Sequence, residues 1–186
     1  FTFARGLLND FDEPDFPHPL LDVYWAIPGR LLLGPTPAAR GASRIAERLT
    51  WLAETGVARI LDLTEAADGL PHYEQYLISG EMQLNSCRLA RFRASDVTIM
   101  RQMIDQLRDW LENDETVYLC DLNGAERAGM LLACLFIERG MTAQQAMEEV
   151  NRLRFETQIT PALRSPESQE QWERVIGWAK RESLVL

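Results

Sequence analysis

The sequence predicts an α/β domain with a central, mainly parallel sheet and helices on both faces, because short apolar runs alternate with longer segments of helical spacing. The runs at 57–64 and 116–120 are rich in leucine and β-branched side chains, as in buried strands. The segment 127–138 is apolar on nearly all sides, which is typical of a helix at the centre of a domain. A length of 186 residues allows one sizeable core and is too short for two ordinary domains.

The first part of the chain predicts an irregular arm followed by strands around one helix. Residues 1–21 are rich in Pro, Asp and Phe and are expected to wrap the domain without regular structure, so that the domain itself covers 22–186. The expected elements are, in order, two short strands in 22–34 joined by Pro28-Gly29, a helix over 40–55 ended by Gly56, a strand at 57–64, a short helix at 71–78 and a strand at 82–90.

The second part predicts four helices and one further strand. Methionines recur on the inner face of the first of these helices, and we interpret them as core residues. The expected elements are, in order, a helix from an Asp96 N-cap to Asn113, a strand at 116–120, the loop 121–126, the apolar helix 127–138, a helix from a Thr142–Gln145 capping box to about Phe155, and a last helix started by Ser165-Pro166.

The composition argues against several classes of function. The chain has 19 lysines and arginines against 28 aspartates and glutamates, a net charge of −9, whereas a nucleic-acid binder usually carries a basic field. The longest apolar run, 130–137, is far too short to cross a membrane. Cys87, Cys120 and Cys134 are an odd set without close spacing, so we expect reduced thiols in a cytoplasmic setting. With two histidines and no metal-binding motif, neither a metal nor another cofactor is expected.

The segment 117–129 is where the sequence indicates chemistry. A buried strand ends, a short loop containing Gly124 turns, and Arg127 opens the apolar helix. Backbone N–H groups at such a helix start form an anion site, and an arginine fork can hold phosphate at two points. Junctions of this kind also occur as plain connections, so the segment by itself leaves both interpretations open.

The same segment resembles the signature loop of the cysteine-dependent dual-specificity and tyrosine phosphatases, which is His-Cys, five residues, Arg, then Ser or Thr and Gly. Gly124 matches the loop glycine, Arg127 the phosphate-binding arginine and Gly129 the glycine that follows. The resemblance covers about residues 22–180 and implies the phosphatase fold. Within the family, the chain is similar to the bacterial and plant dual-specificity-like members. Its other matching segments are 24–31, 60–65, Leu70-Pro71, Tyr73, Gly140, Ala146, Leu153-Arg154, 165–167 and Gln171.

The chain departs from this family at four functional positions. Asp121 stands where the family has its cysteine nucleophile, and Cys120 stands where it has the preceding histidine. Arg91 aligns with the general-acid aspartate, and Ala128 with the hydroxyl residue that assists the leaving thiolate. The resemblance therefore implies a degenerate site, whose phosphate-loop positions are Leu122, Asn123, Gly124, Ala125 and Glu126.

Charge makes the altered loop a poor phosphate site. A carboxylate is a weaker nucleophile than a thiolate, and it places a permanent anion in the cradle. Two unit charges about 4 Å apart repel by roughly 4 kcal/mol at an effective dielectric constant of about 20, which exceeds one charge-assisted hydrogen bond of roughly 1.5–3 kcal/mol. Glu126 adds a second negative charge. We therefore expect weak or no phosphate binding, with Asp121 paired instead to Arg127 and to the N–H groups of the loop.

Other interpretations keep an enzyme in view. Cys120 could act as the nucleophile, although six residues instead of five then separate it from Arg127. Asp121 could be the nucleophile of an aspartyl-phosphate enzyme, although no supporting motif accompanies it. Asp121 could also be an engineered replacement of a cysteine, which leaves the other three changes unexplained. Asp96 is the nearest carboxylate that could serve as a displaced general acid, and its ordinary role would be that of a helix N-cap.

The function that follows from the sequence is that of a pseudophosphatase, a phosphatase-like domain that acts as a binding or regulatory module. The alternative is an active phosphoric monoester hydrolase of unusual mechanism, or an inactivated variant of a cysteine phosphatase. The expected partner is a phosphorylated or acidic protein or small molecule, and neither nucleic acid nor a membrane.

Overall fold

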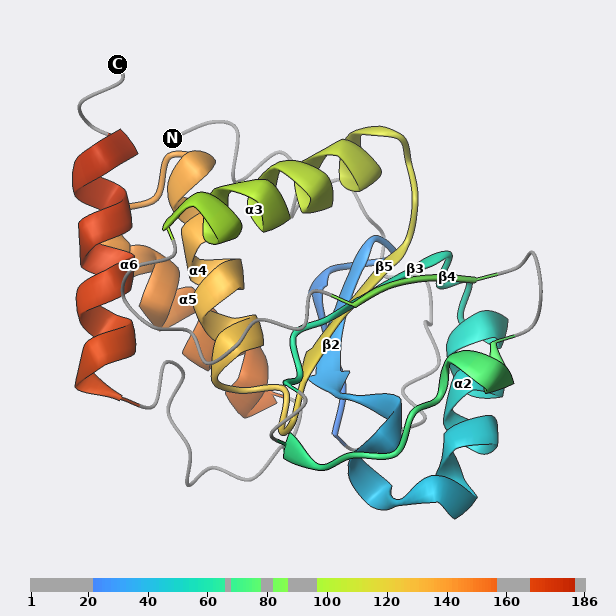
Figure 1. The fold of residues 1–186 in the computed structure, drawn as a ribbon. Coiled ribbons are helices and arrows are strands. Elements are labelled where there is room, and N and C mark those ends of the chain that lie inside the picture. Colours follow the sequence, from blue (N-terminus) through green and yellow to red (C-terminus); the bar gives the residue numbers. More distant parts are fainter. Residues whose placement is uncertain (1–21, 66–67, 78–81, 87–96, 157–167, 183–186) are drawn as a thin grey trace.

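In the computed structural model, the described residues form a five-stranded sheet with one α-helix on one face and four on the other (Figure 1). The structure describes residues 22–65, 68–77, 82–86, 97–156 and 168–182. The predicted arm at 1–21 lies outside these residues. The strands are β1 (Tyr24–Ile27), β2 (Leu31–Pro35), β3 (Arg59–Asp62), β4 (Gln83–Ser86) and β5 (Val117–Asp121).

The sheet is mainly parallel, as the sequence predicts. Its strand order is β1-β2-β5-β3-β4, with β1 antiparallel to β2 and the other three pairs parallel. Parallel strands bring their carboxyl ends to one edge, which is where ligands of open α/β sheets usually bind. In β5, Asp121 pairs with Pro35 of β2, and Cys120 pairs with Asp62 of β3. The end of β5 therefore lies between the ends of two neighbouring strands.

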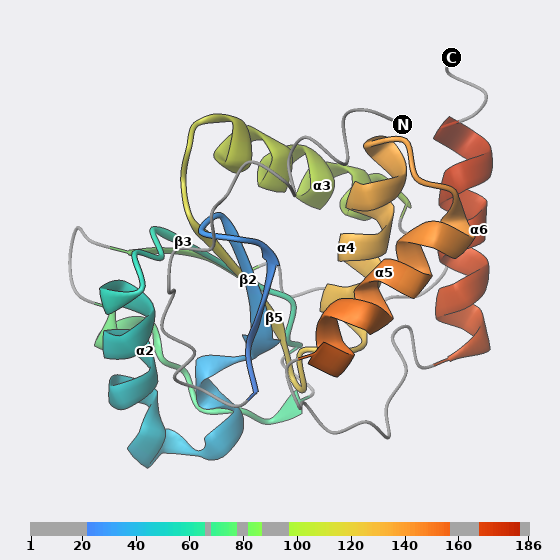
Figure 2. The ribbon, with the colours of Figure 1, turned by 180° about the vertical axis from the view of Figure 1, so that it is seen from behind.

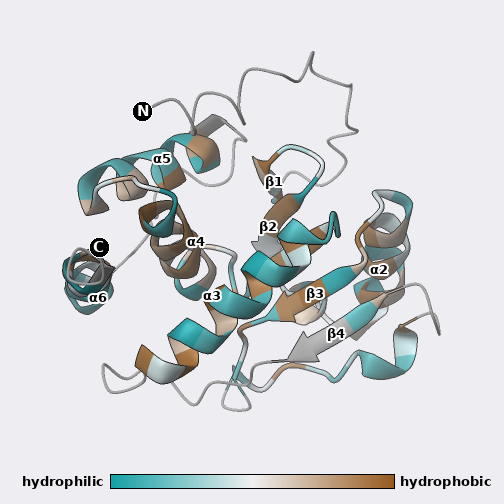
Figure 3. Ribbon diagram, turned by 90° about the horizontal axis from the view of Figure 1, so that it is seen from above, coloured by the Kyte–Doolittle hydropathy of each residue, from teal (hydrophilic) through white to brown (hydrophobic). Residues whose placement is uncertain are grey.

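The helices form two layers, one on each face of the sheet (Figures 1 and 2). α2 (Ile45–Glu54) covers one face, and α3 (Val97–Glu112), α4 (Arg127–Glu138), α5 (Ala143–Glu156) and α6 (Gln169–Glu182) lie on the other. Viewed from above, α4 is predominantly apolar, whereas α6 presents mostly polar residues (Figure 3). Every residue of α4 from Ala128 to Ile137 is buried, as its sequence predicts for a central helix. Among the described helices, none is both long and apolar enough to span a membrane.

Two hydrophobic cores lie on the two faces of the sheet. Side chains along a strand point alternately to opposite faces, so neighbouring residues of β5 enter different cores. Val117 and Leu119 pack in the larger core with α3, α4, α5 and α6, whereas Tyr118 and Cys120 pack in the smaller core with α2. This alternation decides which side chains at the end of β5 can reach the loop that follows.

Several element boundaries differ from the prediction. The helix expected over 40–55 begins only at Ile45, because residues 37–44 form two short 3-10 turns joined at Gly41, whose φ of 86° lies in the left-handed region. Of the short helix expected at 71–78, the described residues 71–77 contain only the 3-10 helix Glu74–Tyr76. The expected N-caps Asp96 and Ser165 lie outside the described residues.

Capping boxes begin both of the last two helices. The predicted pair is confirmed at α5, where the Thr142 N–H donates to Gln145 Oε1 at 3.0 Å and the Gln145 N–H donates to Thr142 Oγ1 at 3.2 Å. Ser168 and Gln171 form the same reciprocal pair at α6, with distances of 3.4 and 3.2 Å. This second box was not predicted, because the sequence pattern Ser165-Pro166 favours an earlier start of the helix.

Candidate functional site: the loop between β5 and α4

The loop 121–127 is held in place by the strand ends on either side of it. The Thr36 N–H donates to the carbonyl oxygen of Asp121 at 2.6 Å, and the Leu63 N–H donates to that of Cys120 at 2.8 Å. Gly124 has φ +71°, and its Cα lies directly against Gly34 of β2. A Cβ atom on Gly124 would stand 2.5 Å from the carbonyl carbon of Gly34. The loop is therefore closely packed against the end of β2.

The carboxylate of Asp121 is bound by the N–H groups of its own loop. Its Oδ1 accepts from the N–H of Asn123 at 3.0 Å and from the N–H of Gly124, and its Oδ2 accepts from the N–H of Ala128 at 2.9 Å. Asp121 is only 1% exposed. Burial raises the pKa of the Asp121 carboxyl, and the three N–H groups and the charge of Arg127 oppose this shift without cancelling it. The expected contact between Asp121 and the loop N–H groups is therefore present.

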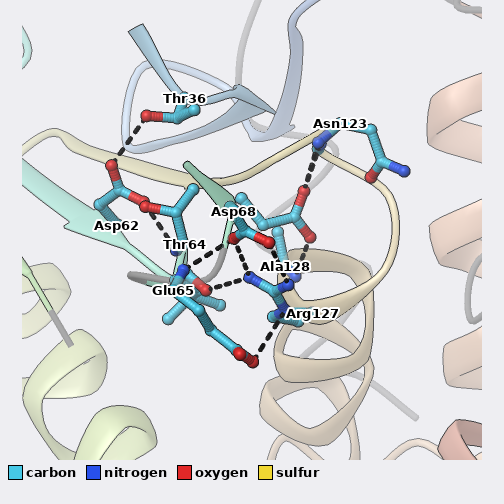
Figure 4. Close-up of polar contacts among 11 residues, drawn as sticks. Thr36, Asp62, Thr64, Glu65, Asp68, Asn123, Arg127 and Ala128 are labelled. Carbon is cyan, nitrogen blue, oxygen red and sulfur yellow. Dashed lines mark hydrogen bonds and ion pairs between the residues drawn. The ribbon is translucent and has the colours of Figure 1, made fainter. Parts of the chain in front are cut away.

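The guanidinium of Arg127 is held by the segment that follows β3 (Figure 4). It donates to Asp68 through two nitrogens, at 3.0 and 3.3 Å, and to the carbonyl oxygen of Leu63 at 2.7 Å. Glu65 adds a longer ion pair, 3.8 Å from Arg127 Nε. The prediction that Arg127 pairs with Asp121 is wrong in this respect, because its direct carboxylate partners are Asp68 and Glu65. Burial lowers the pKa of Arg127, but the three nearby carboxylates outweigh it, and the net shift is upward.

Asp68 is a site residue that sequence reasoning missed. It lies 59 residues before Arg127, in a segment with no recognisable motif, so no spacing rule connects the two. Two other carboxylates lie at the end of β3 and just beyond it. Asp62 Oδ1 accepts from the Thr64 N–H at 2.8 Å, as in a turn, whereas Glu65 lies against Arg127.

Asp62 is a buried structural carboxylate beside the loop. Besides Thr64, it accepts from the hydroxyl groups of Thr36 at 2.8 Å and of Tyr73 at 2.6 Å, both at Oδ2. Asp62 and Thr36 are 3% and 0% exposed, so this network is closed to solvent. A buried carboxylate with this many donors is a structural feature, because no acceptor capacity is directed toward a ligand.

Cys120 lies on the far face of the sheet from Asp121. It is fully buried in the smaller core with Ile60 and Tyr118. Burial, and then the negative charges of Asp62 and Asp121, raise the pKa of the Cys120 thiol well above its ordinary value. A nucleophilic cysteine needs the opposite, an accessible thiol with a lowered pKa. The geometry therefore gives no support to Cys120 as a nucleophile.

The other predicted site residues fall into three groups. Leu122 is 43% exposed at the mouth of the loop, and Ala125 is buried, with its N–H donating to Asn123 Oδ1 at 2.9 Å. Ala128, which the resemblance aligns with the family's hydroxyl residue, is fully buried. Arg91 and Asp96, proposed for the general-acid loop, lie outside the described residues.

The described part of the site is acidic. Asp121, Glu126, Glu65 and Asp68 contribute four carboxylates against the single guanidinium of Arg127. No group of three or more His, Cys, Asp or Glu side chains within the described ranges is placed to hold a metal ion. What the arrangement can do chemically is limited by this charge, because an incoming phosphate meets N–H groups and an arginine that already have anionic partners.

Comparison with solved structures identifies the fold. Tk-PTP in its active form superimposes with a TM-score of 0.70 and 19% identity over 89% of this chain and 99% of that chain. Kinase associated phosphatase, with serine for its catalytic cysteine, has a TM-score of 0.71 and 13% identity over 89% and 96%. Human tyrosine phosphatase-like serine/threonine/tyrosine-interacting protein has a TM-score of 0.64 and 14% identity over 89% and 99%.

The fold of this chain is therefore that of the dual-specificity and protein-tyrosine phosphatases, as the resemblance implied. No protein-family model matches the chain, and no curated protein matches it in sequence. Identities of 13–19% establish the fold alone, and the activity has to be argued from the site.

Proposed function

We propose that this chain is a pseudophosphatase, a phosphatase-fold module that binds or regulates and does not turn over phosphate esters by the cysteine mechanism. The observation that carries the proposal is the state of Asp121. It stands at the nucleophile position, and its carboxylate is buried and accepts three backbone hydrogen bonds from the loop. A buried carboxylate whose two oxygens already accept three backbone hydrogen bonds is not free to attack phosphorus.

The partners of Arg127 support the same proposal. In a working phosphate loop, the arginine fork must be available to two oxygens of the ligand. Here the fork is matched by both carboxylate oxygens of Asp68. A phosphate ester would have to displace the ion pair between Arg127 and Asp68. It would also approach the negative charge of Asp121, so both effects would weaken its binding.

The proposed partner is a phosphorylated or acidic protein or small molecule, and the proposed setting is cytoplasmic. Cys120 and Cys134, the two cysteines among the described residues, are both buried and neither is in a disulfide bond, which supports a reducing compartment. A name among the similar structures, tyrosine phosphatase-like interacting protein, supports a binding role for this fold. Because the site is acidic, such a partner would bind the loop more tightly if part of the negative charge of the site were removed.

Hydrolysis of an aryl phosphate across a range of pH tests the proposal. The chain is compared with Asp121→Cys, Asp121→Asn and Arg127→Met, and with Asp105→Asn as a matched control on the exposed side of α3. We expect no turnover by the chain above the Arg127→Met background. Turnover that is lost in Asp121→Asn and kept in Asp105→Asn would overturn the proposal in favour of a hydrolase of unusual mechanism. Activity in Asp121→Cys alone would support it, with Asp121 as the residue that silences the loop.

A further inference from the structure

Asn123 and Gly124 form the only Asn-Gly pair of the sequence, and this pair lies in the middle of the loop 121–127. In such a pair, the backbone nitrogen that follows the asparagine can attack the carbon of the side-chain amide. Glycine favours this attack because it has no Cβ to hinder the approach. The attack closes a five-membered succinimide ring and releases ammonia. Whether it occurs in a folded protein depends on the groups that surround the attacking nitrogen.

The side-chain carbonyl of Asn123 is folded over the nitrogen of Gly124. Asn123 Oδ1 accepts from the N–H of Ala125 at 2.9 Å, which is an Asx turn, a contact between an asparagine side chain and the backbone two residues on. The ring closed by this hydrogen bond includes the Gly124 nitrogen, so the attacking atom and the amide carbon are held in one small ring. The Ala125 N–H also stabilises the negative charge that develops on Oδ1 during the attack, as the donor of an oxyanion hole does.

Asp121 is placed to take the proton of the attacking nitrogen. The N–H of Gly124 donates to Asp121 Oδ1. A peptide nitrogen is a poor nucleophile while it keeps its proton, and a carboxylate that accepts this proton during the attack acts as a general base. The N–H bond lies in the plane of the peptide, so Asp121 meets the nitrogen at its edge and leaves its face to the Asn123 side chain. Burial raises the pKa of the Asp121 carboxyl, which makes it a stronger base than an exposed aspartate.

Solvent reaches the reacting side chain. Asn123 is half-buried, and the preceding residue, Leu122, is 43% exposed. Figure 4 shows the side chain of Asn123 pointing away from Arg127. Ammonia can therefore leave, and water can reach a succinimide ring, without displacement of the buried carboxylate or of the arginine.

We propose that the loop 121–127 modifies itself at Asn123, by attack of the Gly124 nitrogen with Asp121 as the general base. The new bond joins the nitrogen of Gly124 to Cγ of Asn123, and the bond between Cγ and Nδ2 of Asn123 breaks. The proton that Asp121 accepts passes to Nδ2, which departs as ammonia. Solvent water then adds to either carbonyl group of the succinimide ring and opens it. The product is an aspartate or an isoaspartate where Asn123 stood.

Either product changes the loop irreversibly. Both add a carboxylate to a site that is already acidic. Isoaspartate also adds one carbon atom to the backbone before Gly124, which is packed directly against Gly34. The longer backbone disturbs this packing and the contacts of the loop N–H groups with Asp121. The inference goes beyond the proposed function, and it holds whether or not the chain hydrolyses phosphate esters.

Peptide mapping by mass spectrometry tests the proposal, after the folded chain has stood for days at neutral pH in isotopically labelled water. The label enters only side chains that are hydrolysed during this time. Asn113 and Asn151 are controls within the same chain, because the carboxamide nitrogen of each donates to a backbone carbonyl oxygen and no glycine follows. Labelled product should form at Asn123 at least about tenfold faster than at either control. Equal labelling at the three positions would overturn the proposal.

A pair of variants separates the role of Asp121 from the general reactivity of an Asn-Gly pair. Asp121→Asn removes the base but keeps a hydrogen-bond acceptor of nearly the same size, and Glu54→Gln removes an exposed carboxylate on α2 as the matched control. The rate of labelling at Asn123 should fall at least about tenfold in Asp121→Asn, because a positioned base contributes that much or more. It should not change in Glu54→Gln. An equal rate in Asp121→Asn and the wild-type chain would overturn the proposal.

If Asp121→Asn does not fold, the wild-type chain unfolded in urea takes its place. Unfolding releases the contact of Asn123 with Ala125 and that of Gly124 with Asp121, so the rate of labelling at Asn123 should be lower in urea than in the folded chain. A rate in urea that equals or exceeds the folded rate would mean that the loop does not promote the reaction, and it would overturn the proposal.

Discussion

Replacing Gly124 with alanine should damage the loop far more than the same change at Gly140. Both glycines have positive φ, 71° and 95°, in the region that L-residues with a Cβ avoid. This backbone cost is roughly 1–2 kcal/mol at either position. At Gly140, which follows α4, the new Cβ would meet nothing within 4 Å, so we expect only that cost.

Gly124 adds a clash that its surroundings cannot relieve. Its Cβ would lie 2.5, 2.7 and 2.9 Å from the carbonyl carbon, Cα and carbonyl oxygen of Gly34. These are backbone atoms of β2, which is paired with β1 on one side and β5 on the other, so they cannot rotate away as a side chain would. Overpacking of this kind costs a further 1–3 kcal/mol or so. The total for Gly124→Ala is therefore about 2–5 kcal/mol.

Equilibrium unfolding in urea measures the difference between Gly124→Ala and Gly140→Ala. With a slope of about 2 kcal/mol per molar urea, the midpoint of Gly124→Ala should lie roughly 0.5–1.5 M below that of Gly140→Ala. Equal midpoints with equal slopes would refute the reasoning, because they would mean that Gly34 and the loop are not in contact.

Two further predictions concern the carboxylates on either side of β2. Tyr73→Phe removes one of the donors to buried Asp62 and should lower the free energy of unfolding by about 1.5–3 kcal/mol in the same urea assay. Tyr76→Phe, at an exposed tyrosine, should change the free energy of unfolding by less than about 0.5 kcal/mol. Equal losses in the two variants would contradict the hydrogen-bond network around Asp62. Arg48→Met breaks a nearly buried two-point ion pair with Asp22 and should lower the free energy of unfolding by about 2–4 kcal/mol at neutral pH. The loss is limited because Arg40, which is exposed, still contacts the same carboxylate. Burial by itself would raise the pKa of Asp22, but its arginine partners outweigh burial and lower it, so the stability from this pair is present above the unfolded pKa of about 3.9 and is lost as the pH falls through the lower folded value. The gap between wild type and Arg48→Met should therefore narrow at about pH 3, and a gap that widens in acid would contradict the assignment.

Most of the regular elements were predictable because they depend on local patterns. The apolar run before Asp121 and the apolar helix after Glu126 define strand, loop and helix with little ambiguity, and α4 begins at Arg127 as predicted. The boundaries that failed are those where one residue outweighs the periodicity. Gly41 interrupts the apolar spacing of 40–55, and its effect on the backbone is not visible in a hydrophobic pattern.

The candidate site was only partly predictable, because its contacts join distant segments. The sequence placed Asp121 and Arg127 in one loop, since residue identity and short spacing carry that information, and the family resemblance implied that Asp121 stands at the position of the nucleophilic cysteine. It assigned Arg127 to the wrong carboxylate partner. Which of many acidic residues lies beside the guanidinium depends on the conformation of the segment after β3, which no local pattern specifies.

The sequence by itself determined the order of strands and helices along the chain, the α/β class and the position of the loop 121–127. It also determined that the residue at the start of this loop, Asp121, carries a carboxylate. Hydrophobic periodicity and residue type are properties of short segments and need no knowledge of distant neighbours. Tertiary structure alone decided that Cys120 is buried behind the sheet, that Gly34 packs against Gly124, and that Asp68 holds Arg127. Each of these contacts joins parts of the chain that only the packed sheet brings together, and the availability of a side chain for chemistry depends on which neighbours already bind it.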